Sequence, residues 1–287
     1  MDIYTWIHIA NLLVGLVAPL AGVLIKRYSL IRTLRGFYIF AAAMFTLKAV
    51  MTYLVTEETA QGRFRMQETR DQSPFSILGG YKEVFHEVLK TPPTLTIAGI
   101  MLVLSIYNLI SGSFWAIIVT EKLRIPAENI AIFPFIKTAI MLLLFFAVMP
   151  KISKLPFKIP MLVGFFNIIA SQVVLITAPE LGVASLILSV VLEACSLAAL
   201  NPLVDQMMVL SISARERARI QSILTTGIIL LTAPFGWIAG MLSETNKDLP
   251  FILNIGLFVL GAVLVYGSGL RKGHDVRVAE VDEWGAG

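Results

Sequence analysis

The sequence is poor in charged residues and has almost no cysteine. Only 15% of its 287 residues are Asp, Glu, Lys or Arg, whereas soluble globular proteins carry about 25%. The one cysteine, Cys195, lies inside an apolar run, which excludes a disulfide framework and favours a packing role. The three histidines lack metal-ligand spacing, and no glycine-rich phosphate-binding loop is present. These absences argue against an enzyme, a metal site, a cofactor and coupling by ATP hydrolysis within this chain.

What the sequence has in abundance is apolar residues, which make up 57% of the chain. A water-soluble fold of this length has too small an interior to hide that much apolar surface, so the lipid bilayer is the expected solvent. In a bilayer only helices and closed barrels satisfy every backbone polar group. Barrel strands alternate apolar and polar residues over about ten positions, whereas the apolar runs here are long and continuous. We therefore predict an all-α integral membrane protein.

The apolar runs are long enough to cross a membrane as helices. A helix needs about 20 apolar residues to span the hydrocarbon core. The formal net charge of +4 falls mainly in short loops between these runs, so it indicates orientation in the membrane and not nucleic-acid binding. We predict eight transmembrane helices, at Thr5–Ile25, Gly36–Thr56, Leu95–Val119, Asn129–Met149, Ile159–Thr177, Leu181–Val209, Ile220–Leu242 and Pro250–Leu270.

One long polar stretch, from Glu57 to Thr94, separates the first two predicted helices from the other six. Its second half places Tyr81, Val84 and Val88 at helical spacing among charged residues, which predicts an amphipathic helix at the membrane surface. A solvated connector is a compatible alternative. We expect four parts: two helices in residues 1–56, a cytoplasmic linker in 57–94, a six-helix bundle in 95–270 and a cytoplasmic tail in 271–287.

Loop charges predict how the chain is oriented. The loops after the fourth and sixth predicted helices and the start of the tail are rich in Lys and Arg, while Glu180 and Glu244 lie in the loops on the opposite side. The positive-inside rule then places both termini in the cytoplasm, with the chain crossing the plasma (inner) membrane several times. The loop between the first two helices disagrees, because it contains Lys26 and Arg27. We expect helices outside this chain to hold that pair in place.

The first and seventh predicted helices share a short repeat. Ala18-Pro19 aligns with Ala233-Pro234, and the small residue Ala21 aligns with Gly236. At the same offset the second predicted helix falls on the eighth. The first pair therefore looks like a copy of the last pair, with four helices between them. Two six-helix halves, of which the first is represented only by its last two helices, would give this arrangement.

This layout resembles the major facilitator superfamily (MFS) of transporters from its fifth helix to its twelfth. The segment Thr56–Gly62 is similar to the Glu-Thr-x-x-Gly tail that follows the sixth helix of that family. The basic turn from Pro150 to Lys158 resembles the turn between its eighth and ninth helices, and Ala233–Gly240 resembles its Gly/Pro-rich eleventh helix. The resemblance covers almost the whole chain. Helices one to four, with the family's best signature loop, have no counterpart in it.

The resemblance implies a definite architecture and a definite activity. The chain would contain the last two helices of the N-terminal MFS bundle and a complete C-terminal bundle of six. Its activity would be secondary transport of a small solute by alternating access, with protons as a candidate coupling ion. Such a chain would be an incomplete transporter, whether a fragment, a split gene product or a truncated gene model. It would need the missing N-terminal helices or a partner chain for activity.

Two charged residues, Lys137 and Glu193, lie deep inside predicted helices. A charge in mid-membrane costs roughly 2.5–3.5 kcal/mol on insertion scales unless it is paired or hydrated. Both helices enter from the same side, and a rise of 1.5 Å per residue places Lys137 about 12 Å deep and Glu193 about 18 Å deep. A lysine side chain is long enough to span that difference. We predict either an ion pair on the substrate or proton pathway, or a fixed salt bridge that orients the two helices.

Other residues are weaker candidates. Asn201 and Asp205 share one helix face, with Pro202 between them, and the polar side chains of Asn108, Tyr107 and Asn11 lie near the middle of their predicted helices. Each could line the substrate pathway, although interhelical hydrogen bonds are the commoner role of such residues. A final group of small residues and prolines is expected to permit close packing or bending: Pro19, Gly22, Pro234, Gly236 and Gly240.

Two alternatives to transport remain open. The chain could be an autonomous eight-helix membrane protein with an assembly or sensing role, in which case the first two helices should pack fully against the other six. It could also be a homodimer in which two copies form a channel. A transporter predicts instead that the first two helices stand apart from the six, with Lys137 and Glu193 facing the space between.

Overall fold

A computed structural model describes residues 13, 15–57, 62–63, 66, 92–147, 156–211 and 217–267, and the described residues form helices and no strands. The predicted amphipathic helix of the linker, the tail of residues 271–287 and Asn11 lie outside this part of the chain. The described helices are α2 (Ala18–Tyr28), α3 (Leu30–Val55), α6 (Pro92–Glu121), α7 (Ala127–Ile130), α8 (Ile132–Ala147), α10 (Lys158–Leu181), α11 (Val183–Ser211), α12 (Arg217–Thr245) and α13 (Leu249–Gly267).

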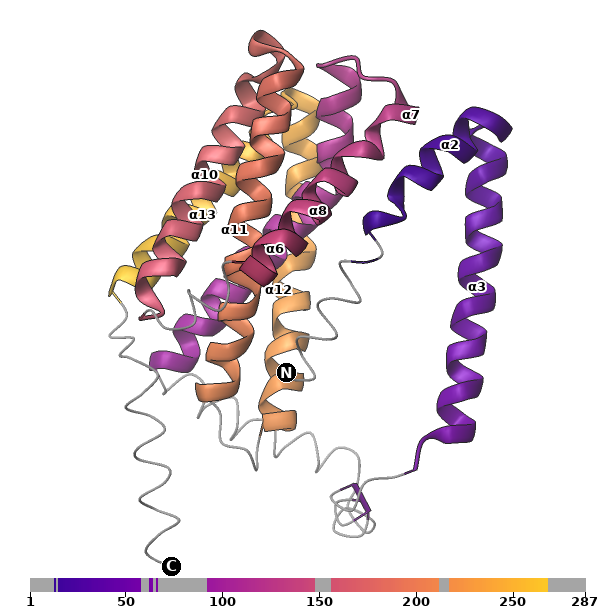
Figure 1. The fold of residues 1–287 in the computed structure, drawn as a ribbon. Helices are drawn as coiled ribbons and strands as arrows, with labels where there is room; N and C mark the ends of the chain where they lie inside the picture. The colour runs from indigo at the N-terminus through magenta and orange to yellow at the C-terminus, as the bar shows by residue number, and fades with distance from the viewer. Residues whose placement is uncertain are drawn as a thin grey trace, which may run out of the picture.

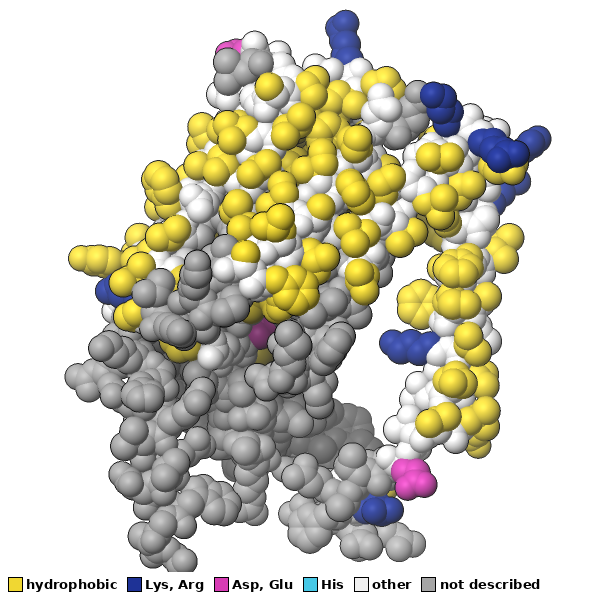
Figure 2. Space-filling view, in the orientation of Figure 1, with side chains coloured by type: hydrophobic (Ala, Val, Ile, Leu, Met, Phe, Trp, Pro, Cys, Tyr) yellow, Lys and Arg dark blue, Asp and Glu magenta, His cyan; other side chains and the backbone are white. Residues whose placement is uncertain are grey.

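Six of these helices are long and apolar enough to cross a membrane, which indicates a multi-pass membrane protein. They are α3, α6, α10, α11, α12 and α13, and each corresponds to one of the eight predicted spans. Hydrophobic side chains cover much of the visible part of the bundle and of α3, and most of the visible lysines and arginines lie toward the ends of the molecule (Figure 2). The first predicted span, Thr5–Ile25, is described only in part, because the placed residues begin at position 13.

The predicted span Asn129–Met149 differs from expectation, because the chain forms two helices there. The four-residue helix α7 ends at Ile130, and α8 starts at Ile132. Pro134 explains the break: proline has no N–H to donate to residue 130, and its ring clashes with the carbonyl four residues earlier. The apolar helix α8 has 16 described residues, fewer than the other candidate spans.

Helices α6, α8, α10, α11, α12 and α13 pack into one bundle (Figure 1). In this bundle α6 contacts α11, α12 and α13, while α10 contacts α11 and α13, and α8 packs mainly on α11. At one end of the bundle Gly182 alone joins α10 to α11; we call this the Gly182 end. Gly182 has a φ of 86°, which favours glycine because it has no Cβ. At the opposite end, here the Tyr266 end, Lys158 Nζ donates to the backbone oxygen of Tyr266.

Helices α2 and α3 stand to one side of the bundle (Figure 1). They meet at a sharp turn centred on Ser29, which has a φ of 78°. Helix α2 packs on α7 and α8, whereas α3 makes its main contacts with α2. The apolar window of α3 is 0% buried, so nearly all of its hydrophobic side chains are exposed within the described structure. The two N-terminal helices therefore do not merge with the other six into a single bundle.

The bundle interior contains two large apolar clusters. The cluster toward the Tyr266 end is built around Tyr107, Phe165 and Phe258. The cluster toward the Gly182 end is built around Leu175, Val190 and Phe251. The gap between these clusters falls along α6, α10, α11 and α13, and the candidate site lies at that level.

Helices α10 and α11 approach each other closely at Gly164. A Cβ built on Gly164 would lie 2.7 Å from Leu200 Cγ, well inside van der Waals contact. Beside this point Ser196 donates from Oγ to the backbone oxygen of Gly164 at 2.5 Å. Two turns further on, Ser171 Oγ donates to the backbone oxygen of Ser189 at 2.9 Å. Small residues and serine hydroxyls thus hold the two helices together, as is common between helices in lipid.

Candidate functional site: a buried ion pair

Lys137 on α8 and Glu193 on α11 form an ion pair between two packed helices. Lys137 Nζ lies 2.7 Å from Glu193 Oε1. The ion pair predicted from the depths of the two residues along their helices is therefore present. The Glu193 side chain is 7% exposed and that of Lys137 is 31% exposed. The carboxylate is therefore inside the bundle, while the ammonium reaches it from the rim. This asymmetry leaves one side of the pair accessible.

A third helix contributes to the same carboxylate. Tyr107 on α6 is 1% exposed and donates its hydroxyl to Glu193 Oε1, the oxygen that also faces Lys137. The Tyr107 ring packs against that of Phe258, with centroids 5.1 Å apart, and this contact fixes its position. Glu193 thus receives a charged donor and a neutral donor from two different helices. One carboxylate links α6, α8 and α11.

The N-terminal helices approach this site beside Lys137. Thr138, the next residue on α8, is buried, and its side chain lies directly against Gly15. A Cβ on Gly15 would overlap the Thr138 hydroxyl, so only glycine fits at this contact. The segment that leads into α2 therefore touches α8 one residue away from the ion pair.

No protein-family model, curated protein or solved structure matches this chain. Within the described part of the chain, no group of three or more His, Cys, Asp or Glu side chains is placed to hold a metal ion. The side chains at the site can transfer a proton, exchange an ion-pair partner for another charged group and form hydrogen bonds.

The other predicted pathway residues do not join Glu193. Asn201 and Asp205 are partly buried on α11, 8 and 12 residues beyond Glu193, which corresponds to roughly 12 and 18 Å along the helix. Asn108 is exposed although its neighbour Tyr107 is buried, because successive residues point about 100° apart around a helix. Roles for Asn201, Asp205 and Asn108 in the pathway remain predictions.

The predicted hinge and packing residues lie in varied surroundings. Pro19 occupies the first turn of α2, where proline is well accommodated, and Gly22 is buried on the same helix. Gly236 lies against α6, since a Cβ there would be 3.5 Å from Leu109. A Cβ on Gly240 would meet nothing within 4 Å, and Pro234 is exposed inside α12. Close packing thus describes Gly22 and Gly236 better than Gly240, and bending at Pro234 remains a prediction.

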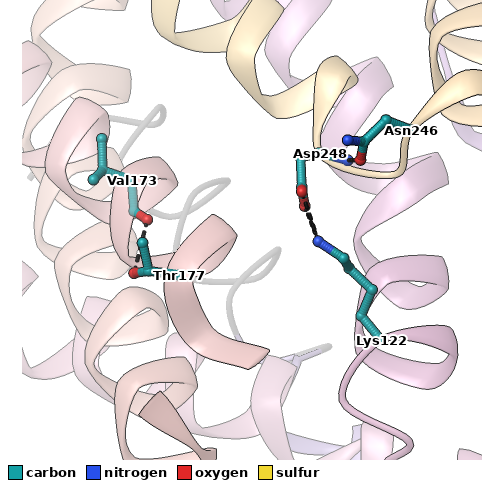
Figure 3. Close-up of polar contacts among 5 residues, drawn as sticks. All are labelled: Lys122, Val173, Thr177, Asn246 and Asp248. Carbon is teal, nitrogen blue, oxygen red and sulfur yellow. Dashed lines mark hydrogen bonds and ion pairs between the residues drawn. The ribbon is translucent and has the colours of Figure 1, made fainter. Parts of the chain in front are cut away.

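A second ion pair, which the sequence did not reveal, lies at the Gly182 end. Lys122 Nζ contacts both carboxylate oxygens of Asp248 at 2.6 Å (Figure 3). Asn246 Oδ1 accepts the backbone N–H of Asp248 at 2.9 Å, which shapes the turn between α12 and α13. The pair ties the end of α6 to this turn. Both residues are in loops or at helix ends, where sequence alone gives no partner.

We expect Lys122→Ala to lower stability only slightly. The Lys122 side chain is 31% exposed, and pairs near a solvated surface contribute about 0.2–1 kcal/mol. Thermal unfolding in detergent should show a correspondingly small decrease in Tm, and high salt should reduce the difference from the parent protein. Lys247→Ala, which removes a looser 3.3 Å contact to Glu121, is the matched control and should change Tm less. A large, salt-independent loss for Lys122→Ala would contradict this assignment.

Proposed function

We propose that this chain acts in a secondary transporter of the MFS type, which moves a small solute across the membrane by alternating access. The observation that carries the proposal is the Lys137–Glu193 pair, a 2.7 Å contact between the apolar helix α8 and the candidate membrane span α11. Ionisable groups at such depth are expensive and are typical of substrate and proton pathways. The 31% exposure of the Lys137 side chain is compatible with access of a proton or a charged solute group to the pair.

Glu193 would act as the switch in this mechanism. Its oxygen Oε1 accepts from both Lys137 and Tyr107, and so holds α8 and α6 against α11. A proton on Glu193, or a charged solute group that replaces one member of the pair, removes the attraction between α8 and α11. A ligand shifts a conformational equilibrium by its difference in affinity for the two states. Exchange of the pair for the solute would bias the protein between inward-open and outward-open forms.

In this proposal α2 and α3 belong to the other half of the transporter. Helix α3 makes its main contacts with α2 and not with the six-helix bundle, and its apolar window is 0% buried, which supports that role. An autonomous eight-helix protein with an assembly or sensing role would instead bury α3 against the bundle. Further helices, supplied by a longer form of the chain or by a partner chain, would cover α3 and complete the solute pathway.

The proposal is tested by solute accumulation in membrane vesicles from the native cells, which supply the longer form or partner chain that completes the pathway, and from the same cells after deletion of the chain. A panel of labelled sugars, amino acids, organic acids and hydrophobic cations is compared between vesicles with and without the chain, under an imposed pH gradient. We expect at least one solute class to accumulate only when the chain is present. Equal accumulation of every class in the two vesicle types would contradict transport.

For the solute so identified, we expect Glu193→Gln to reduce the transport rate about tenfold, equivalent to 1.4 kcal/mol. The amide keeps the shape of the carboxylate but loses its charge, so neither the proton nor the ion pair can be exchanged. Glu180→Gln is the matched control, because Glu180 is exposed at the Gly182 end and should transport normally. Transport by Glu193→Gln at the parent rate and with the parent pH dependence would exclude the switch.

A further inference from the structure

The gap between the two apolar clusters is filled by polar residues from five helices. Helices α6, α10, α11 and α13 each contribute residues to both clusters, with a short segment between the two contributions. A buried or partly buried polar residue lies in each of these segments. On α8 the corresponding stretch lies between Phe133 and Met141. We call this set the polar layer; it consists of Ser111, Lys137, Gln172, Glu193 and Asn254.

Only part of the polar layer is satisfied by protein groups. Lys137 and Glu193 pair with each other, and Tyr107 donates to Glu193. In contrast, Gln172 Oε1 and both amide atoms of Asn254 are buried and have no hydrogen-bond partner among the described residues, while the Ser111 hydroxyl lies beside that of Tyr107. Asn254 is 0% exposed and Gln172 is 2% exposed. A buried polar group without any partner is destabilising, because it has given up its hydrogen bonds to water without a replacement.

These polar groups lie at one level of the bundle. Asn254 follows Phe251 by three residues and precedes Phe258 by four, so all three share one face of α13. Phe258 packs on Tyr107. Ser111 lies one turn from Tyr107 on the same face of α6, toward the Gly182 end. Asn254 likewise lies one turn from Phe258 toward the Gly182 end. Gln172 comes from α10, which packs along α13. Polar groups of α6, α10 and α13 thus lie at a similar level, and both α6 and α10 pack on α13.

We propose that Ser111, Gln172 and Asn254 form an internal water-binding site inside the six-helix bundle. The Asn254 amide needs an acceptor for its N–H groups and a donor for its oxygen, and water supplies both. A metal cation would satisfy the oxygens but not the N–H groups, and an apolar solute would satisfy neither. Buried waters in proteins typically make about three hydrogen bonds to such groups.

This site goes beyond the proposed transport function and does not depend on it. Ser111 is one turn from Tyr107, whose hydroxyl donates to Glu193. Water bound at Ser111 therefore extends the polar contacts of Glu193 through Tyr107 toward α10 and α13. The carboxylate would have a hydrated neighbour inside the bundle as well as the partly exposed Lys137 at its rim.

Radiolytic hydroxyl-radical footprinting of the protein in lipid nanodiscs tests this inference, because X-rays generate radicals from bound water in place. Phe251 and Phe258 flank Asn254 and are both 0% exposed, so bulk water does not reach them. We expect both rings to be oxidised in the parent protein and to lose that oxidation in Asn254→Leu. Met161 is the internal control: it is reactive, 0% exposed and far from the polar layer on α10, and should stay unlabelled.

Two further variants keep the test decisive if Asn254→Leu folds poorly. Asn254→Ser retains a hydroxyl and room for water, so labelling of Phe251 and Phe258 should persist. Gln172→Met removes one acceptor and should weaken the labelling. Absence of labelling in the parent protein, or labelling equal to that of Asn254→Leu, would overturn the water site. A rise of several degrees in the Tm of Asn254→Leu would also overturn it, because such a rise would show that the parent amide had no partner.

Discussion

Replacement of Lys137 by methionine is expected to reduce the free energy of unfolding by about 3 kcal/mol. The substitution leaves the Glu193 carboxylate buried, with Tyr107 as its remaining donor. Removal of one partner of a buried pair is far more harmful than replacement of both, because the second charge is left without compensation in a medium of low polarity. Methionine fills much of the volume of the lysine stem, so the change reports mainly on charge.

The double variant Lys137→Met/Glu193→Gln separates the charge from the packing. We expect it to recover most of the loss, because the neutral amide can still accept from Tyr107. Reversible unfolding of each variant in mixed micelles gives the coupling energy of the pair. Lys48→Met on α3 is the control, since Lys48 is exposed and its replacement should change stability by less than about 0.5 kcal/mol. Losses that simply add in the double variant would contradict a coupled pair.

Gly164→Ala is expected to destabilise the bundle by about 2 kcal/mol. The new methyl group would lie 2.7 Å from Leu200 Cγ, the branch point of a side chain that is 0% exposed. Leu200 cannot turn away without disturbing its neighbours, so α10 and α11 must separate. That separation would also lengthen the Ser196 hydrogen bond to the Gly164 backbone.

Gly256→Ala on α13 is the matched control, because a Cβ there meets nothing within 4 Å. Alanine favours helix over glycine by about 1 kcal/mol, so this variant should be neutral or more stable. Unfolding of both variants under the same conditions distinguishes a steric clash from a general effect of glycine replacement. In the Gly164→Ala background, Leu200→Ala should cost less than in the parent protein. Equal stability of the two glycine variants would show that α10 and α11 do not touch at Gly164.

The membrane class and the central pair could be predicted from the sequence because both depend on position along a helix. Apolar run length gave the spans, and the rise per residue placed Lys137 and Glu193 within reach of each other. Packing of α8 on α11 then allows the pair to form. The break between α7 and α8 was not predicted: Pro134 disfavours a continuous helix there, but Pro202 and Pro234 lie inside the unbroken helices α11 and α12, so a proline alone does not locate a break.

What the sequence could not provide is the direction in which each polar side chain points. Tyr107 and Asn108 are neighbours at the same depth, yet Tyr107 contacts Glu193 and Asn108 is exposed. Gln172 and Asn254 look like isolated polar residues in apolar runs, and only the packing of α10 on α13 brings them to one level. Whether a side chain points into the bundle depends on which helices are neighbours, and that information is spread over the whole chain.

The single-residue joint at Gly182 limits which helices can move independently. Because one residue joins them and they are in close contact at Gly164, α10 and α11 form a rigid unit that carries Glu193. Separation of Lys137 from Glu193 then requires displacement of α8, which can pivot at the break between Ile130 and Ile132. In the proposed cycle, spin labels on α10 and α11 would keep a constant separation while a label on α8 swings relative to both.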